Sequence, residues 1–165
     1  MSKLTWKLQE KFVDKVLKGE YLFWDFSQKE GIYVFGDSFH FYVIPMEDVF
    51  IDFIKLENYN GHINNLKEMN LIRGYERMNF DEPVNFTFDI QKRDKNEIRR
   101  FESDRCDIWI GMPYLKEIDF DRNLEYFTIG SDPESGYRKP VRFECEDFTA
   151  VILPVRIKAS DDDAD

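Results

Sequence analysis

The sequence predicts an α+β fold in which an antiparallel sheet has helices packed on one of its faces. Three observations support this class. The first residues have the spacing of an amphipathic helix, several short segments alternate apolar and polar residues between turn signals, and this order of helix and strands occurs again in the second half of the chain. Hydrophobic residues make up 42% of the 165 residues and aromatic residues 16%, which is enough apolar material for one domain with a packed core.

The clearest helix is expected over residues 3–18. At about 100° per residue, the apolar side chains fall on one broad arc, and five lysines fall within about 120° of one another. The apolar positions are Leu4, Leu8, Phe12, Val13 and Val16, extended by Trp6 and Leu17. The lysines are Lys3, Lys7, Lys11, Lys15 and Lys18. Gly19 follows the last apolar position and suits the end of a helix.

Three short strands are expected next, at residues 21–26, 31–36 and 39–44, because aromatic and β-branched residues alternate there between turn sequences. Pro45 ends the third strand, since it has no N–H group to donate to a neighbouring strand. Residues 49–56 fit either a fourth strand or a short helix. Residues 57–80 are rich in Asn and are expected to form a connector, with a helical rhythm in part of it.

The second block repeats the first in outline. We expect a strand at 84–90, and then a helix from Asp94 to about Glu102, because Asp94 and Glu97 have the spacing of a capping box. Further strands are expected at about 107–110, 124–129, 141–145 and 148–157.

Two strand endings resemble each other, PheTyrValIlePro at 41–45 and AlaValIleLeuPro at 150–154. Together with the block order, this predicts one domain over residues 1–158, built from two similar half-units at about 1–56 and 81–158. Residues 57–80 connect the half-units, and residues 159–165 are expected to form an acidic, disordered tail.

The charge and hydropathy patterns narrow the class of partner. The net charge is −10, from 33 acidic and 23 basic residues, and spread evenly over the surface it would repel nucleic acid and anionic membranes. Four of the acidic residues lie in the segment 160–165, however. No apolar run is long enough to span a membrane, and the N-terminus has no apolar signal core. We therefore expect a protein of the cytoplasm without a membrane partner.

The residue types that support catalysis or metal binding do not cluster in the sequence. Cys106 and Cys145 are far apart and belong to no CxxC pair, so we interpret them as small reduced core residues. His40 lies in a strand and His62 in a loop, and neither is part of a nucleophile arrangement. Trp6, Trp24 and Trp109 are expected in the core. The sequence therefore predicts a binding protein rather than an enzyme, with no cofactor, metal or catalytic residue.

The last third of the chain has the most specific pattern. ProTyrLeu at 113–115, an apolar strand at 124–129, LysProValArgPhe at 139–143 and AlaValIleLeuProValArgIle at 150–157 follow one another in this order. This arrangement resembles the end of a bacterial DNA sliding clamp, the β subunit of DNA polymerase III. The resemblance is good over about 45 residues and looser over about 75, from Val84 onward.

The resemblance implies a DNA-clamp-like fold, in which two helices on one face of the sheet line a hole that fits duplex DNA. Cations on both helical regions would contact phosphates without reading bases. In the second helical region these would be Lys92, Arg93, Lys95, Arg99 and Arg100, in addition to the five lysines of the first helix. A polymerase or another replication protein would bind beside the last strand, where the matched positions are Val151, Leu153, Pro154, Val155 and Arg156. Clamp chains have three such domains, so a ring of this chain would be a homo-oligomer of about six copies.

Two alternatives remain open at the level of the sequence. The lysine stripe also fits an ordinary solvated helix face, because Glu10 and Asp14 can pair with lysines three or four residues away. The chain would then be an acidic protein-interaction module or inhibitor that uses a clamp-like fold without binding DNA. Salt-dependent binding to duplex DNA and the oligomeric state distinguish the two functions.

Overall fold

A computed structural model describes residues 2–59, 63–65, 80–120, 125–128 and 140–155. The protein is mixed α+β, with two sheets and few helices in the described residues. The order of strands in the larger sheet is β4-β1-β2-β3-β11-β10-β9-β5, and in the smaller sheet it is β6-β7-β8. The expected α+β class is confirmed.

Helix α1 spans Lys3–Leu17, as expected. Its first turn is capped by Ser2, whose Oγ accepts a hydrogen bond from the Thr5 backbone N–H at 3.1 Å. After its last turn the chain reverses at Gly19, whose φ of 73° is favourable for glycine. Leu8, Phe12 and Val16 are buried against the sheet. Trp6 was expected in the core, but it is 44% exposed and stacks on Phe50, because it lies at the margin of the apolar arc.

The three strands expected after this helix are present. They are β1 at Leu22–Ser27, β2 at Ile32–Gly36 and β3 at His40–Pro45, joined in antiparallel pairs. A 3-10 turn at Met46–Asp48 follows β3. The segment at 49–56, which fitted either strand or helix, contains the start of helix α2 at Phe53–Tyr59. Most of the expected connector lies outside the described residues, but Ile63–Asn65 forms β4, which pairs with β1 in parallel.

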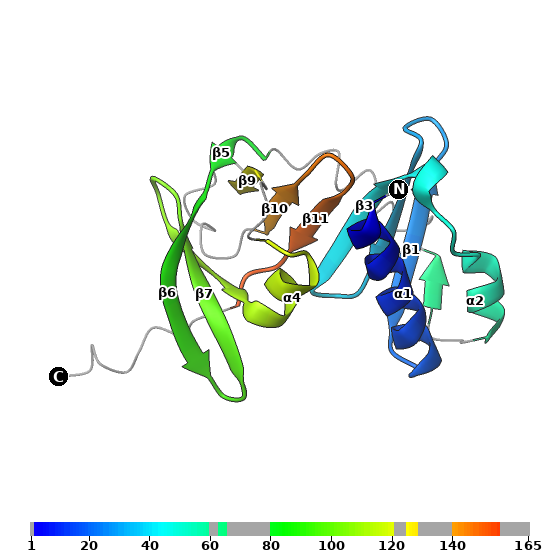
Figure 1. The fold of residues 1–165 in the computed structure, drawn as a ribbon, viewed down its shortest axis with the longest axis horizontal. Coiled ribbons are helices and arrows are strands. Elements are labelled where there is room, and N and C mark those ends of the chain that lie inside the picture. Colours follow the sequence, from blue (N-terminus) through cyan, green and yellow to red (C-terminus); the bar gives the residue numbers. More distant parts are fainter. Residues whose placement is uncertain (1, 60–62, 66–79, 121–124, 129–139, 156–165) are drawn as a thin grey trace.

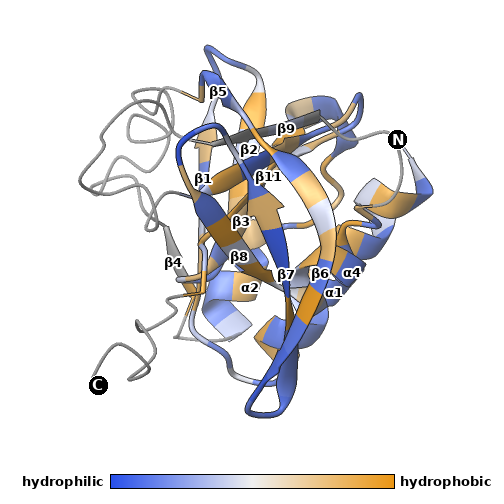
Figure 2. Cartoon of the chain, turned by 90° about the vertical axis from the view of Figure 1, so that its left-hand side faces the viewer, coloured by the Kyte–Doolittle hydropathy of each residue, from blue (hydrophilic) through white to orange (hydrophobic). Residues whose placement is uncertain are grey.

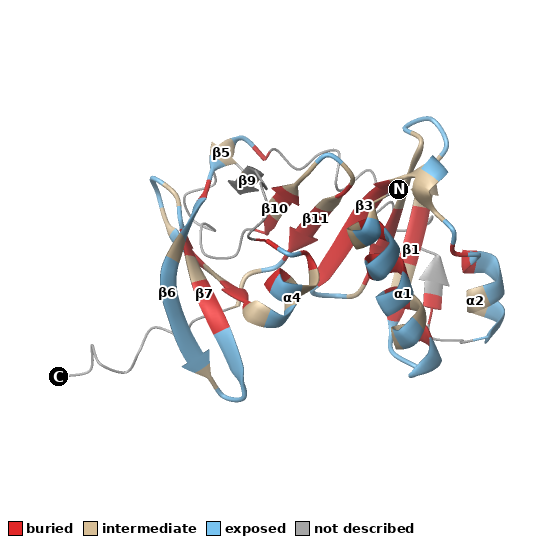
Figure 3. Ribbon diagram, viewed as in Figure 1, coloured by how far each residue is buried: buried red, intermediate tan, exposed pale blue. Residues whose placement is uncertain are grey.

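The other half of the larger sheet comes from residues 82–152. Its strands are β5 at Glu82–Pro83, β9 at Glu125–Thr128, β10 at Val141–Glu144 and β11 at Thr149–Ile152. Strand β11 pairs antiparallel with β3, and this pairing joins the two halves into one continuous sheet. Buried residues are concentrated along β3, β10 and β11, near the centre of this sheet (Figure 3).

The smaller sheet corrects one prediction. Its strands are β6 at Asn85–Arg93, β7 at Asn96–Glu102 and β8 at Asp107–Gly111. The helix expected from Asp94 to about Glu102 is wrong, because this segment turns at Asp94, with φ 52°, and then runs as β7. Aspartate is common both at a helix N-cap and at a left-handed turn position. The hairpin forms because β7 pairs with β6 on one side and with β8 on the other.

The helix that lies beside α1 comes later in the chain. Helix α4 spans Met112–Glu117, directly after β8, and contains the ProTyrLeu sequence. Helices α1 and α4 lie side by side on the same face of the larger sheet (Figures 1 and 2). The main core fills the space between these helices and the sheet, and includes Phe35, Phe143 and Leu115.

Candidate nucleic-acid interface

The lysines of α1 do not all have the same surroundings. Lys3, Lys7, Lys11 and Lys18 are exposed, and Lys15 is half-buried. The Lys15 Nζ lies 4.0 Å from Asp37 Oδ2 and 4.0 Å from Glu117 Oε1. Lys15 therefore belongs to an internal charge cluster, whereas the other four are open to a ligand.

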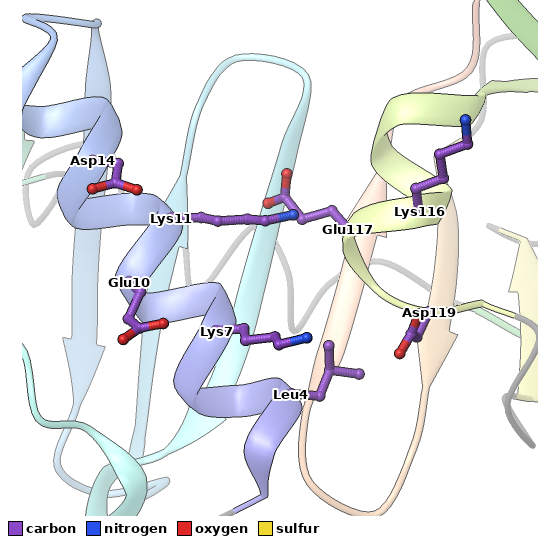
Figure 4. Close-up of a pocket in the computed structure, with 8 residues that line it drawn as sticks. All are labelled: Leu4, Lys7, Glu10, Lys11, Asp14, Lys116, Glu117 and Asp119. Atoms are coloured by element: carbon purple, nitrogen blue, oxygen red, sulfur yellow. The ribbon is translucent and has the colours of Figure 1, made fainter.

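A groove of about 310 Å³ runs between α1 and α4. It is lined by Leu4, Lys7, Glu10, Lys11, Asp14, Lys116, Glu117 and Asp119. Lys7 and Lys11 extend from α1 toward α4, and Glu117 and Asp119 come from the opposite wall (Figure 4). Three cations and four carboxylates line the groove, so its charge is mixed.

A buried cluster adjoins this groove at Glu117, which contributes to both. The His40 side chain is 1% exposed, and its Nδ1 lies 2.9 Å from Asp37 Oδ1. Its Nε2 lies 3.6 Å from Glu117 Oε1, which also accepts a hydrogen bond from the Tyr42 hydroxyl at 2.5 Å. The Tyr114 ring packs on the imidazole, with centroids 4.6 Å apart. We refer to Lys15, Asp37, His40, Tyr42, Tyr114 and Glu117 as the His40 cluster.

The pKa values of Glu117, Asp37, His40 and Tyr42 are shifted by their surroundings. Burial alone would raise the pKa of the Glu117 carboxyl, but its contacts with His40, Tyr42 and Lys15 outweigh burial and lower it to about 2. The pKa of Asp37 is lowered in the same way, against the effect of burial, by its hydrogen bond to His40. Burial would lower the pKa of His40, yet the hydrogen bond to Asp37 and the contact with Glu117 raise it above its usual value. Burial and Glu117 together raise the pKa of the Tyr42 hydroxyl.

The cations expected on a second basic helix lie on the β6–β7 hairpin instead. Arg99 is only 8% exposed; its Nε donates to the Thr87 carbonyl at 2.8 Å, and its guanidinium lies 4.7 Å from the centre of the Phe120 ring. Arg100 contacts Asp89, Glu102 and Asp107 at 2.6, 3.0 and 3.1 Å, and the first of these contacts raises its pKa most.

The remaining hairpin cations do not join the α1 lysines. Lys92 and Lys95 are exposed and Arg93 is half-buried, all near the turn of the hairpin. Figure 1 shows this turn well away from α1. The expected single surface formed by two basic helices is therefore wrong: the predicted cations form two separate groups, and Arg99 and Arg100 are engaged within the protein.

The residues matched to a clamp's partner-binding site lie at the end of the described chain. Val151 is buried at 2% exposure, and Pro154 and Val155 are half-buried. Leu153 is exposed, and its backbone N–H donates to the Phe39 carbonyl at 2.8 Å. The Phe39 side chain is also exposed. Arg156 lies outside the described residues.

Apart from Lys15, the residues of the His40 cluster were not among the predicted site residues, and neither was Lys116. The sequence contains one local signal, since Asp37 and His40 are three residues apart at the turn before β3, which places both side chains at the same end of the hairpin. Nothing in the sequence indicates that Glu117, 77 positions after His40, completes the cluster. That contact depends on how α4 packs against the sheet.

Other kinds of site have little support in the described part of the chain. It contains no group of three or more His, Cys, Asp or Glu side chains arranged to hold a metal ion. Cys106 and Cys145 are both free and half-buried. None of its helices is long and apolar enough to cross a membrane.

Comparison with known proteins gives no relatives: no protein-family model matches the sequence, and neither a curated protein nor a solved structure is significantly similar. Any function must therefore be argued from the geometry of the chain.

Proposed function

We propose that this protein is a sliding-clamp-like accessory of replication or repair, which contacts the backbone of duplex DNA through the face formed by α1 and α4. The observation that carries the proposal is the placement of these two helices. They lie together on one face of a sheet that is continuous across β3 and β11, which is the arrangement expected of a clamp domain.

The topology supports the clamp-like part of the proposal. The order α1–β1–β2–β3 occurs again as α4–β9–β10–β11, and the two sets meet at the β3–β11 pair. In that pair Phe41 lies opposite Val151 and Tyr42 lies opposite Ala150. The similarity of segments 41–45 and 150–154 equates Phe41 with Ala150 and Tyr42 with Val151. The pairing is thus symmetric under the same equivalence, as expected for two half-units related by a local two-fold axis.

The charge distribution supports weak contact with a polyanion. Lys3, Lys7 and Lys11 are exposed on α1, and Lys116 is exposed on α4. Ammonium groups contact phosphates without regard to base sequence. The carboxylates of the groove reduce the attraction, which suits a protein that moves along DNA in the cytoplasm with a polymerase or another replication protein. A closed ring would require several copies of the chain.

The test is the binding of a fluorescent duplex, followed by anisotropy at increasing salt. The triple variant Lys3→Glu, Lys7→Glu, Lys11→Glu should lose about tenfold or more in affinity and should show a shallower dependence on salt. Lys15 is left intact, because its reversal would place a third carboxylate in the His40 cluster. The matched control is Lys92→Glu with Lys95→Glu, which reverses exposed cations on the hairpin and should bind like the unmodified protein. Equal binding by the triple variant and the unmodified protein would refute the proposed face.

A second candidate is a protein-interaction module that does not bind DNA. It is favoured by β6, which is almost entirely exposed (Figure 3) and has three apolar side chains along its length. These are Phe86, Phe88 and Ile90, exposed at 41%, 83% and 45%. With a net charge of −10, such a protein would show no DNA binding even at low salt, and Phe88→Ser would weaken binding to its protein partner.

Size-exclusion chromatography with light scattering separates the two candidate functions further, since a closed oligomer supports the clamp and a monomer supports the interaction module.

A further inference from the structure

The His40 cluster joins parts of the chain that are far apart in sequence. Asp37 lies in the turn between β2 and β3, His40 and Tyr42 are on β3, Lys15 is on α1, and Glu117 is on α4. Within the described residues, these groups and Tyr114 are the titratable side chains that surround the imidazole. The cluster therefore connects the second helix of the α1/α4 face to the first set of strands.

Two carboxylates approach opposite nitrogens of one buried ring. Asp37 is 2.9 Å from Nδ1, and Glu117 is 3.6 Å from Nε2. A doubly protonated imidazole presents an N–H to both, whereas a neutral ring has one N–H and one lone pair. This geometry thus favours a positively charged His40, and the raised pKa of this group agrees with it.

The two carboxylates would respond differently if His40 lost a proton. Asp37 also accepts hydrogen bonds from the backbone N–H groups of Phe39 and His40, at 2.8 and 3.0 Å, so the turn is held without the ring charge. The shorter contact with Asp37 would keep the remaining proton on Nδ1. Glu117 would then face the lone pair of Nε2, with Tyr42 and the Lys15 ammonium at 4.0 Å as its other partners. The contact that weakens is therefore the one to α4.

We propose that His40 is a pH-controlled latch: when it is protonated it fastens α4 to β3, and when it is neutral this contact is lost and α4 opens more readily. Helix α4 is short, at six residues, and its last turn is held by long hydrogen bonds, such as Ile118 N–H to the Tyr114 carbonyl at 3.4 Å. A helix of this kind depends on tertiary contacts. The latch is independent of DNA binding and can be measured without DNA.

The first measurement is a titration of the histidine ring signals by NMR. The sequence has two histidines, so a His62→Asn variant assigns the signals. We expect His40 to titrate above 6.5, and Glu117→Gln and Asp37→Asn each to lower its midpoint. Asp52→Asn is the matched control, since it removes an exposed carboxylate that pairs with Lys55 away from the cluster, and it should change nothing. A midpoint at or below 6.5, or one that neither cluster variant lowers, would overturn the proposal.

The second measurement is hydrogen exchange of the Ile118 and Phe120 amides, corrected for the intrinsic effect of pH. Their protection should fall about tenfold or more as pH rises through the His40 midpoint, while the amide of Val34 in the buried sheet stays protected. In Glu117→Gln the two amides should exchange quickly on both sides of the midpoint, because the latch contact is missing. Protection of α4 that is equal above and below the midpoint would show that His40 has a static structural role.

Discussion

The roles of individual charged residues depend on their partners in space. Lys15 is equivalent to Lys7 and Lys11 on a helical wheel, yet it lies between Asp37 and Glu117. Arg99 and Arg100 are adjacent cations in the sequence, yet one packs among aromatic rings and the other contacts three carboxylates. The helical period predicts which side of α1 a residue occupies, but it contains no information about the element that packs there.

Gly36 is a residue at which the backbone leaves no room for a side chain. A Cβ atom there would lie 2.2 Å from the His40 carbonyl oxygen and 2.6 Å from Phe41 Cα. Gly36→Ala must move the backbone beside the His40 cluster, and we expect it to lower the free energy of unfolding by about 2–4 kcal/mol. Urea denaturation measures this.

The control for Gly36 is Gly111→Ala. There the nearest atom is Cδ2 of the Tyr114 ring, at 3.2 Å, and a side chain can shift by the few tenths of an ångström required. We expect a cost below about 1 kcal/mol at this position. If both variants were equally stable, the close approach of β2 to β3 at Gly36 would be refuted.

At the scale of the element, α1 and strands β1 to β3 were predictable from local pattern, and β7 was not. Alternation of apolar residues indicated β1 to β3 without reference to the rest of the chain. For residues 94–102, the capping-box spacing favoured a helix, while the actual structure depends on β7 lying between β6 and β8. A short segment that fits both helix and strand takes the structure that its tertiary contacts stabilise, and these contacts cannot be seen in a single sequence.

The turn of this hairpin provides a test with opposite outcomes for the two structures. Asp94 has φ 52°, so Asp94→Gly should stabilise the protein by about 0.5–1 kcal/mol, and Asp94→Val should destabilise it. In the helix first expected from the sequence, Asp94 would be the N-cap, and its replacement by glycine would bring no gain. Thermal unfolding of the two variants, compared with the unmodified protein, decides between these structures.

At the scale of the whole molecule, the α+β class and the positions of many strands along the chain followed from the sequence, because hydrophobic alternation and turn residues are local. The five similar residues at 41–45 and 150–154 suggested two related halves, but the pairing of β3 with β11 that joins them was not predicted. The His40 cluster was not predictable, since Glu117 reaches it only after α4 has packed on the sheet. The candidate groove between α1 and α4 shares this dependence.

The stability of the whole protein should vary with pH in a direction set by the cluster. The pKa of Glu117 is lowered from 4.5 to about 2, so its contribution is complete above about 4.5 and is lost as pH falls toward 2. The pKa of His40 is raised above 6.5, so its contribution is complete below 6.5 and is lost as pH rises through the folded-state value. The cluster therefore stabilises the fold most between about pH 4.5 and 6.5.

Comparing the unmodified protein with Glu117→Gln isolates this effect from the other charges of the chain. The difference between their free energies of unfolding should be about 1–2 kcal/mol near pH 5.5, since Glu117 then carries its charge beside a protonated His40. At strongly acidic pH Glu117 is protonated, and at high pH His40 is neutral, so the difference should shrink on both sides. Urea unfolding across this range gives the profile, with Asp52→Asn as the control. A difference that stays constant with pH would mean that Glu117 stabilises the protein by packing alone.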